Sequence, residues 1–488
     1  MSQCSGTRSG FTLRFIAYAG FAYLLAILLF SLHHYREILI ADGAFMVFEM
    51  CNTAWFPQAQ NRLIILILDV LPVLAVNLNF SLKAVILSWI LNYFIFYTIC
   101  FGITALVLKD FLAAGILLAT YAFTLSACFY NVANEIQPAA VLAVTAFSAI
   151  RNRGMQSIWR YVIYVMIFFI AFSHPLVGVA LFLTAIWLTL WDYSSVVAAL
   201  KKYYLLVLVF SSMLVLRMIL ATQNTYESFR LQVSPEMFTD FLTHLNFHYL
   251  RATAHFMLSA FPTLTVLLFS FIAIQLYRRA WRTLTVCLIL TFAYTVVWFF
   301  YVNPQTPWLL NRYDHLTIRW YFPAAFLVVV SFFRTITTLP EQTALRKGFN
   351  LLLIVLLLFQ LYWLHGTALL AQNTVRQYEL LFAAARQQEG SKFYIPEEAT
   401  CRWVYRSQVF VSSLVYSALA APDSSLHIII ANTAHEKPVL QNPSDKILLS
   451  RNYSVSVYKL NKNYFKLHSG PYRRLETDLS ECTGMPPP

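Results

Sequence analysis

The sequence predicts an all-α polytopic membrane protein with a small α/β domain at its C-terminal end. Hydrophobic residues make up 59% of the 488 residues and charged residues only 12%, whereas soluble domains carry about 25% charged residues. Apolar runs of membrane-crossing length recur along residues 1–371. From about residue 372 the composition becomes more polar, and short alternating segments replace the long runs.

The part of the chain before residue 372 is predicted to hold about eleven transmembrane helices, since a helix needs about 20 apolar residues to cross the hydrocarbon layer. The run 63–76 is shorter and contains Asp69 and Pro72, so we expect it to lie on or dip into the membrane without crossing. The predicted spans lie near 11–32, 84–107, 111–130, 137–150, 159–173, 176–191, 203–221, 254–277, 283–302, 319–338 and 349–371.

The basic residues predict the orientation of the chain. The formal net charge is +13, but Lys and Arg are scattered in short groups between apolar runs, which argues against a nucleic-acid partner. Cytoplasmic loops of membrane proteins are rich in Lys and Arg. With a cytoplasmic N-terminus and 63–76 not crossing, the inner loops hold Arg8, Lys109, Arg151, Arg153, Lys201, Lys202, Arg278, Arg279, Arg282, Arg346 and Lys347. We therefore expect an integral protein of the bacterial inner (plasma) membrane, with its C-terminal domain outside the cytoplasm.

Residues 372–488 are predicted to form the extracytoplasmic α/β domain. The stretch "AQNTVRQYELLFAAARQQEG" predicts a polar helix. Alternation of apolar and polar residues predicts strands in "CRWVYRSQVFV", "LHIIIAN", "KILLSRN" and "YSVSVYKL". Cys401 and Cys482 both fall here, in a compartment that permits a disulfide, and their pairing stays open. The sequence shows no nucleophile or metal constellation in this domain.

The first outer loop, residues 33–83, contains the stretch "ILIADGAFMVFEM" directly after the first span. In a helix Asp42 and Glu49 would lie two turns apart on roughly one face. They either belong to an interfacial helix capped by Asp42, or face a reaction centre at the membrane surface. In the second case we expect Gly43 to leave room for a substrate, and the apolar residues 45–48 to hold the helix to the membrane.

Ionisable residues also stand in the later outer loops. Glu135 lies in "YNVANEIQP" and His174 in the turn "SHP", while Arg312, His315 and Arg319 lie in the fifth outer loop. Ionisable groups at membrane depth are costly and indicate function by default. Each also has a structural interpretation: Glu135 as a first-turn acid, His174 as a turn cap, and Arg319 as an anchor at the membrane rim.

Taken together, these features resemble the GT-C superfamily of integral-membrane glycosyltransferases. The resemblance rests on the acid that follows the first span, the acid in the second outer loop, the many spans, the sequence "RWYFP" at 319–323 and the C-terminal outer domain. It is architectural and covers most of the membrane part. The first-loop acid of that family is often a tandem "DE" or "DD", whereas here "ADG" has one acid, so the part played by Glu49 stays open.

The resemblance implies transfer of a sugar from a polyprenyl-phosphate carrier to a glycan, lipid or protein acceptor on the outer face of the membrane. It implies catalytic roles for Asp42, as general base, and for Glu135, as a second base, an acceptor-orienting group or a metal ligand. The cofactor stays unassigned, since a divalent cation is compatible with these carboxylates and nothing in the sequence requires one. Arg312 and Arg319 are implied to bind the departing phosphate, with His174 and His315 as helpers, and Glu49 is a further candidate for substrate binding.

Two other kinds of protein share parts of this pattern. A secondary transporter would have a similar number of spans, but should show repeats and broken helices with charges near the bilayer midplane. Here the charges cluster at the ends of the apolar runs. A polymerase or ligase of lipid-linked glycans would share the carrier and the topology, and would more typically use Arg and His from one large late loop. The fourth outer loop, rich in Arg and His, keeps that alternative open.

Overall fold

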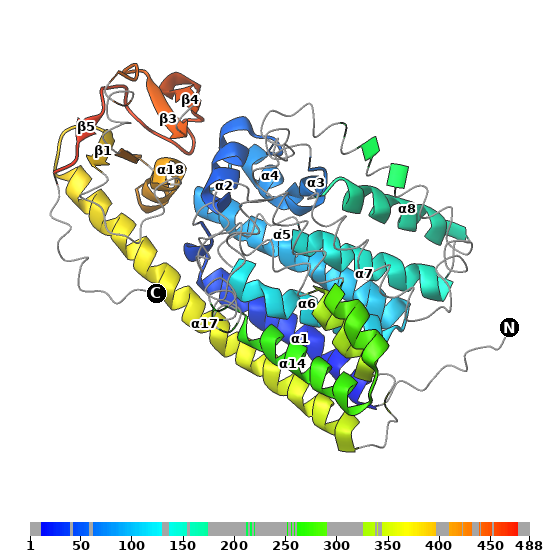
Figure 1. Cartoon of the computed structure of the whole chain (residues 1–488). Helices are drawn as coiled ribbons and strands as arrows, with labels where there is room; N and C mark the ends of the chain where they lie inside the picture. The colour runs from blue at the N-terminus through cyan, green and yellow to red at the C-terminus, as the bar shows by residue number, and fades with distance from the viewer. Residues whose placement is uncertain are drawn as a thin grey trace.

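In the computed structural model most of the described residues are helical, and a small sheet region lies near the C-terminus (Figure 1). The described residues are 11–39, 42–57, 62–128, 136–153, 157–173, 261–289, 326–336, 344–396, 409–421, 423–431, 441–450 and 453–476, with a few single or paired positions between 211 and 258 and at 339 and 439.

The helices before residue 344 follow the predicted apolar runs wherever those runs are described. Further helical residues stand at 281–289 and at Phe326–Ile336. The elements are α1 Phe11–His33, η1 Glu37–Leu39, α2 Asp42–Thr53, α3 Ile65–Leu68, α4 Val70–Asn77, α5 Leu82–Gly102, the π-helical turn η2 Ile103–Val107, α6 Phe111–Cys128, α7 Ile136–Arg153, α8 Ser157–Ala171 and α14 Pro262–Tyr277.

Two helices of the described part are long and apolar enough to cross a membrane, by length and composition. They are Leu82–Val107, which joins α5 to η2, and α17, Ala344–Arg386. α17 runs along the helical body and continues to the strands (Figure 1). It passes without a break through the predicted span 349–371 and the polar helix predicted to follow it. The described helices are compatible with a membrane protein, and the number of spans belongs to the proposal below.

The run 63–76 is broken at Asp69 into α3 and α4, of 4 and 8 residues. Trp89 of α5 donates its indole N–H to Asp69 Oδ1 at 2.7 Å. Asn92 of α5 donates to the Ile67 carbonyl at 2.8 Å and accepts from the Leu71 N–H at 3.3 Å. These bonds satisfy backbone groups at the break and hold both short helices against α5. Neither helix has the roughly 20 residues that a crossing needs.

Helix pairs in the body are joined by a few buried polar contacts. Tyr97 donates to Gln137 Oε1 at 3.3 Å, and Gln137 donates to the Tyr121 carbonyl at 3.0 Å. Thr263 of α14 donates to Gln360 of α17 at 2.9 Å. Hydrogen bonds of this kind join helices whose packing surfaces are otherwise apolar. They fix which faces of α5, α7, α14 and α17 meet.

After α17 the chain forms strands and two further helical elements. These are β1 Lys392–Pro396, α18 Val409–Ala420, β2 His427–Ala431, β3 Lys446–Ser450, β4 Tyr453–Ser456, η4 Val457–Lys459 and β5 Arg473–Arg474. One sheet has the order β2-β1-β5 with parallel pairing, in which Lys392 is paired with His427. The other is the antiparallel pair β3-β4. In Figure 1 this region lies at the far end of α17, next to α2.

The strand predictions for this region are partly confirmed. "LHIIIAN" and "KILLSRN" contain β2 and β3, and the first half of "YSVSVYKL" is β4. The prediction is wrong at the end of "CRWVYRSQVFV", because helix α18 begins at Val409. Ser413 and Ser417 of α18 donate to the carbonyls of Ile428 and Leu426 at 3.0 and 2.9 Å. Packing of α18 on β2 therefore outweighs the local β-propensity of these residues.

Candidate functional site

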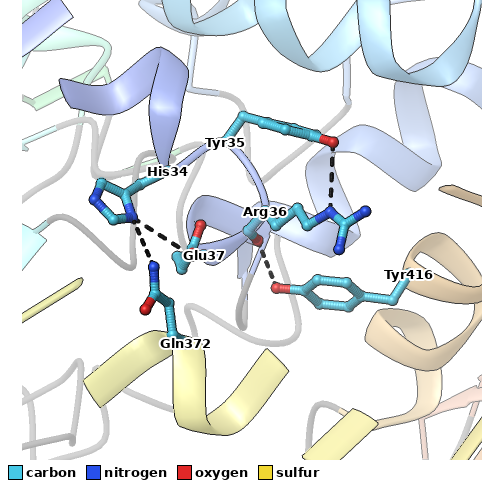
Figure 2. A network of polar contacts seen from close by, with 6 residues as sticks. All are labelled: His34, Tyr35, Arg36, Glu37, Gln372 and Tyr416. Atoms are coloured by element: carbon cyan, nitrogen blue, oxygen red, sulfur yellow. Dashed lines mark hydrogen bonds and ion pairs between the residues drawn. The ribbon is translucent and has the colours of Figure 1, made fainter. Parts of the chain in front are cut away.

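The candidate site is the junction between α1 and α2, residues 33–39, with the side chains that surround it. Figure 2 shows residues of this linker meeting Gln372 of α17 and Tyr416 of α18. The sequence here is "HHYREIL", an abrupt polar stretch after an apolar helix. The linker therefore brings five titratable side chains, His33 to Glu37, together shortly before the helix that Asp42 begins.

His34 and Glu37 form a buried pair at the centre of the junction. His34 Nδ1 lies 3.5 Å from Glu37 Oε1, and Gln372 Nε2 lies 3.4 Å from the same nitrogen. Burial lowers the pKa of His34, and the nearby Glu37 carboxylate offsets part of this effect. The environment thus favours a neutral imidazole, whose Nδ1 either donates to the Glu37 carboxylate or accepts from the Gln372 amide, according to the tautomer.

Three imidazoles lie near one another at this point. The His34 ring centroid is 4.8 Å from that of His33 and 6.5 Å from that of His365 in α17. Metal sites need several ligands converging within about 2–2.6 Å of one point. Among the described residues, no group of three or more His, Cys, Asp or Glu side chains is arranged to hold a metal ion. The arrangement is a cluster of rings that meet edge to face, for His33 and His34, or at a tilt, for His34 and His365.

Two cations flank the phenol ring of Tyr35. The Arg36 guanidinium carbon lies 6.0 Å from the ring centroid, and Lys83 Nζ, at the start of α5, lies 5.2 Å from it. Arg36 also donates to Tyr35 Oη at 3.4 Å and to Glu379 of α17 at 2.9 Å. The Tyr35 hydrogen bond, and then nearby negative charge, raises the pKa of Arg36. The half-buried Arg36 guanidinium, beside its partner Glu379, and the exposed Lys83 ammonium place two cations at this edge of the junction, where they can attract an anion.

Asp42 is the first residue of α2, as the sequence interpretation required; its side chain lies outside the described part. Gly43 has a different role from the expected one. A Cβ on Gly43 would lie 2.3 Å from the Ile38 carbonyl oxygen and 3.8 Å from the Trp89 ring. The expectation that Gly43 leaves room for a substrate is therefore wrong, because the linker's own backbone fills that space. Gly43 lets the chain fold back on the first turn of α2.

The apolar residues of α2 also differ from expectation. Met46, Val47 and Phe48 are buried inside the protein, and Phe45 alone of residues 45–48 is exposed, at 36%. The Phe48 ring centroid lies 5.3 Å from that of Phe465 in the C-terminal region. The expectation that residues 45–48 hold α2 to the membrane is wrong, since the protein itself covers this face.

Glu49 is half-buried on α2, seven residues after Asp42. Burial raises its pKa, and in the described part of the chain no cation lies within ion-pair distance of it. The other proposed site residues, Glu135, His174, Arg312, His315 and Arg319, lie outside the described residues. Of the seven predicted side chains the structure thus places one, Glu49.

A second titratable cluster lies inside the C-terminal region. Lys392 donates to the carbonyls of Ser444 and Lys446 at 2.9 and 2.7 Å, and Tyr472 Oη lies 3.0 Å from His427 Nδ1. Burial lowers the pKa of His427 to about 3 and that of Lys392 to about 8. These contacts tie β1 and β2 to the β3 segment and to the chain before β5. The cluster serves to hold the two sheets together.

The linker side chains Tyr35, Arg36 and Glu37 were not among the predicted site residues. The signal that could have found them is the run "HHYRE", five polar residues directly after an apolar span. The chain matches no known protein-family model, no curated protein sequence and no solved structure. The function therefore has to be argued from the residues and their arrangement.

Proposed function

We propose that the protein is an integral-membrane glycosyltransferase of the GT-C type. It transfers a sugar from a polyprenyl-phosphate carrier to an acceptor on the outer face of a bacterial inner membrane. One observation carries the proposal: α2 begins at Asp42, soon after the first apolar helix, beside a polar junction that holds the half-buried Arg36 and the exposed Lys83. A carboxylate and cations at the same end of a membrane helix are the groups that this reaction needs.

The distribution of charge along the helices supports the orientation of the proposal. Lys83 and Tyr35 meet at the start of Leu82–Val107, and Arg153 donates to the Val107 carbonyl at its other end. At that second end Asp110 bonds Ser148 and Asn152. The exposed basic residues of this end, which the positive-inside rule assigns to the cytoplasm, are Lys109, Arg151, Arg153, Arg278, Arg279 and Arg282.

α14 and the helix Phe326–Ile336 support the same assignment. Gln275, near the basic end of α14, donates to Thr335 at 2.8 Å. Two residues earlier, Phe333 packs against Gly115, near the start of α6 and close to Asp110. The basic ends of α7 and α14 therefore lie at one end of the body. The junction and α2 lie at the other, which in the proposal faces outwards.

The proposed reaction uses one carboxylate and several cations. An acceptor hydroxyl oxygen attacks the anomeric carbon, its proton passes to Asp42, and the bond from that carbon to the carrier phosphate breaks with its electron pair on the phosphate. Cationic side chains stabilise the charge that develops there. Arg312 and Arg319, with His174 and His315, keep that role in the proposal, and Arg36 and Lys83 join them. Glu135 orients the acceptor or serves as an alternative base.

The test is sugar transfer by the purified protein in lipid nanodiscs, using a panel of short-chain polyprenyl-phosphate hexoses. Asp42→Asn keeps the size of the side chain and its ability to cap α2, and removes the proton acceptor. We expect transfer to fall by about 10²–10⁴ while donor binding persists. The matched control is Glu49→Gln on the same helix, which should retain most activity. Near-normal transfer by the Asp42→Asn protein would overturn the role of Asp42, and Glu135 would then be the leading candidate.

A further inference from the structure

A short segment of the C-terminal region, residues 461–465 with the sequence "NKNYF", lies against the first loop. We call it the brace segment. Its side chains reach three parts of that loop. Asn461 contacts the end of α2, Phe465 contacts the middle of α2, and Asn463 and Tyr464 contact the end of α4.

Asn461 supplies hydrogen-bond donors to the C-terminal end of α2. Its side-chain amide donates to the Cys51 carbonyl at 2.8 Å, and its backbone N–H donates to Asn52 Oδ1 at 3.0 Å. The last carbonyls of a helix have no partner within the helix. The Asn463 N–H donates to Asn461 Oδ1 at 3.1 Å, which fixes the orientation of the capping amide. The end of α2 is thus capped by a residue that is 410 positions away in sequence.

The remaining contacts of the brace segment fix its position on the loop. Asn463 donates to Asn79 Oδ1 at 2.8 Å, just beyond α4, and Tyr464 donates to the Val76 carbonyl at 3.4 Å. Phe465 is fully buried against Phe48. Contacts to both α2 and α4 mean that the brace segment cannot move without releasing several bonds at once.

The C-terminal region also holds the other end of α2. Tyr416 of α18 donates its hydroxyl to the Arg36 carbonyl at 2.6 Å, in the linker that enters α2 (Figure 2). The Tyr416 ring stacks on Tyr378 of α17, with centroids 5.1 Å apart. Both rings are buried. The linker before α2 and the last turn of α2 are therefore each bonded to the C-terminal region.

We propose that the C-terminal region is a brace that sets the position of α2, and that Asn461 and Tyr416 are positioning residues for the carboxylate at the start of that helix. The catalytic part of this inference rests on the proposed function. The mechanical part does not, because it concerns only how α2 is held. A displacement of about 1 Å in a reacting group can cost about 10²-fold in rate.

The test uses the full-length protein in nanodiscs and two readouts. The variants are Asn461→Ala and Tyr416→Phe, which remove one tie at each end of α2, and the second keeps the packed ring. The control is Asn442→Ala, which removes bonds confined to the C-terminal region, to the Pro443 and Lys446 carbonyls. Hydrogen–deuterium exchange of residues 42–53 measures the brace. The kcat and the donor KM for transfer measure positioning.

We expect exchange in α2 to rise about tenfold in both variants while exchange in β1 and β2 stays unchanged. We expect kcat to fall about 10- to 100-fold with donor KM within about twofold of wild type. Unchanged exchange in α2 in a folded variant overturns the brace. Faster exchange with an unchanged kcat, in a protein that Asp42→Asn inactivates, overturns the positioning role. If exchange in α2 is faster in the variants but the wild-type protein transfers no sugar, the brace is supported and the proposed function is refuted. If Asn461→Ala does not fold, Tyr416→Phe decides both questions.

Discussion

The two ends of the helical body are built differently. At the basic end, Asp110 caps α6 by accepting the Ala113 N–H at 3.1 Å and bonds Ser148 and Asn152 of α7, while the arginines around it are exposed. At the junction end, charges of both signs are mixed, and His34 and Glu37 are buried. The C-terminal region packs over this end and bonds its backbone.

This difference supports the choice of the junction end in the proposed function. An end that only needs to face water and headgroups can leave its cations exposed, since solvation is cheap there. Burying a carboxylate and an imidazole and covering them with a folded region is costly. Of the two ends, the junction end buries such a pair, His34 and Glu37, in the described part of the chain. This is the end where the proposed reaction takes place.

The largest predicted difference between the two ends is the loss of stability caused by replacing a glycine with alanine. Gly43→Ala at the junction end places a methyl group 2.3 Å from the Ile38 carbonyl oxygen, a backbone atom that cannot move alone. We expect a loss of about 3 kcal/mol in the free energy of unfolding, measured by equilibrium unfolding in mixed detergent micelles.

The control for Gly43→Ala is Gly348→Ala, near the start of α17. Among the described residues, no heavy atom outside its own turn of helix lies within 4 Å of a Cβ on Gly348, and alanine is the better helix former by about 0.5–1 kcal/mol. The control should therefore be neutral or slightly stabilising. If both variants lose the same stability, Gly43 is not held by the linker, and the tight turn into α2 is not what fixes the junction.

The long apolar helices were predictable from the sequence, whereas helix α18 and the junction were not. The length of an apolar run predicts α5 and the apolar part of α17, because a helix needs about 20 apolar residues to cross the hydrocarbon layer. This requirement does not depend on contacts with other parts of the chain. The charge and the shortness of the run 63–76 indicated that it does not cross, but its division at Asp69 into two helices was not predicted. The contacts of the junction join residues far apart in sequence, such as Arg36 with Glu379 and Asn461 with Cys51. No local pattern encodes such pairs.

The corrections on α2 have the same origin. The sequence shows Met46, Val47 and Phe48 as an apolar surface, but does not say whether lipid or protein covers it. Likewise, Gly43 indicates a close approach of some group without identifying that group as the Ile38 carbonyl. The roles of Glu135, His174, Arg312, His315 and Arg319 stay predictions, since they fall outside the described residues.

The next effect lies at the basic end. Asp110→Ala removes the N-cap of α6 and leaves the bonding groups of Ser148 and Asn152 without their acceptor. We expect a loss of about 2 kcal/mol in the free energy of unfolding, with transfer activity unchanged in the folded fraction. The milder control, Ser148→Ala, removes one donor and should cost about 1 kcal/mol. A fall in the kcat of folded protein would mean that this end also takes part in the reaction.

The smallest effect is a pH dependence at Glu49. Burial raises the pKa of this carboxyl above its ordinary value of 4.5, so the folded protein binds the Glu49 proton more tightly than the unfolded chain does. The associated stability is full below pH 4.5 and is lost as the pH rises through the folded-state pKa. Glu49→Gln removes this loss. The stability of the variant should match that of wild type near pH 4 and exceed it near pH 8 by about 0.5 kcal/mol or less, as judged by unfolding midpoints at both pH values.

Glu379→Gln is the control, because it removes an exposed carboxylate paired with Arg36 and should give no gain at pH 8. An equal difference between wild type and the Glu49→Gln variant at both pH values would show that Glu49 ionises freely in the folded protein, as an acid on an uncovered helix would.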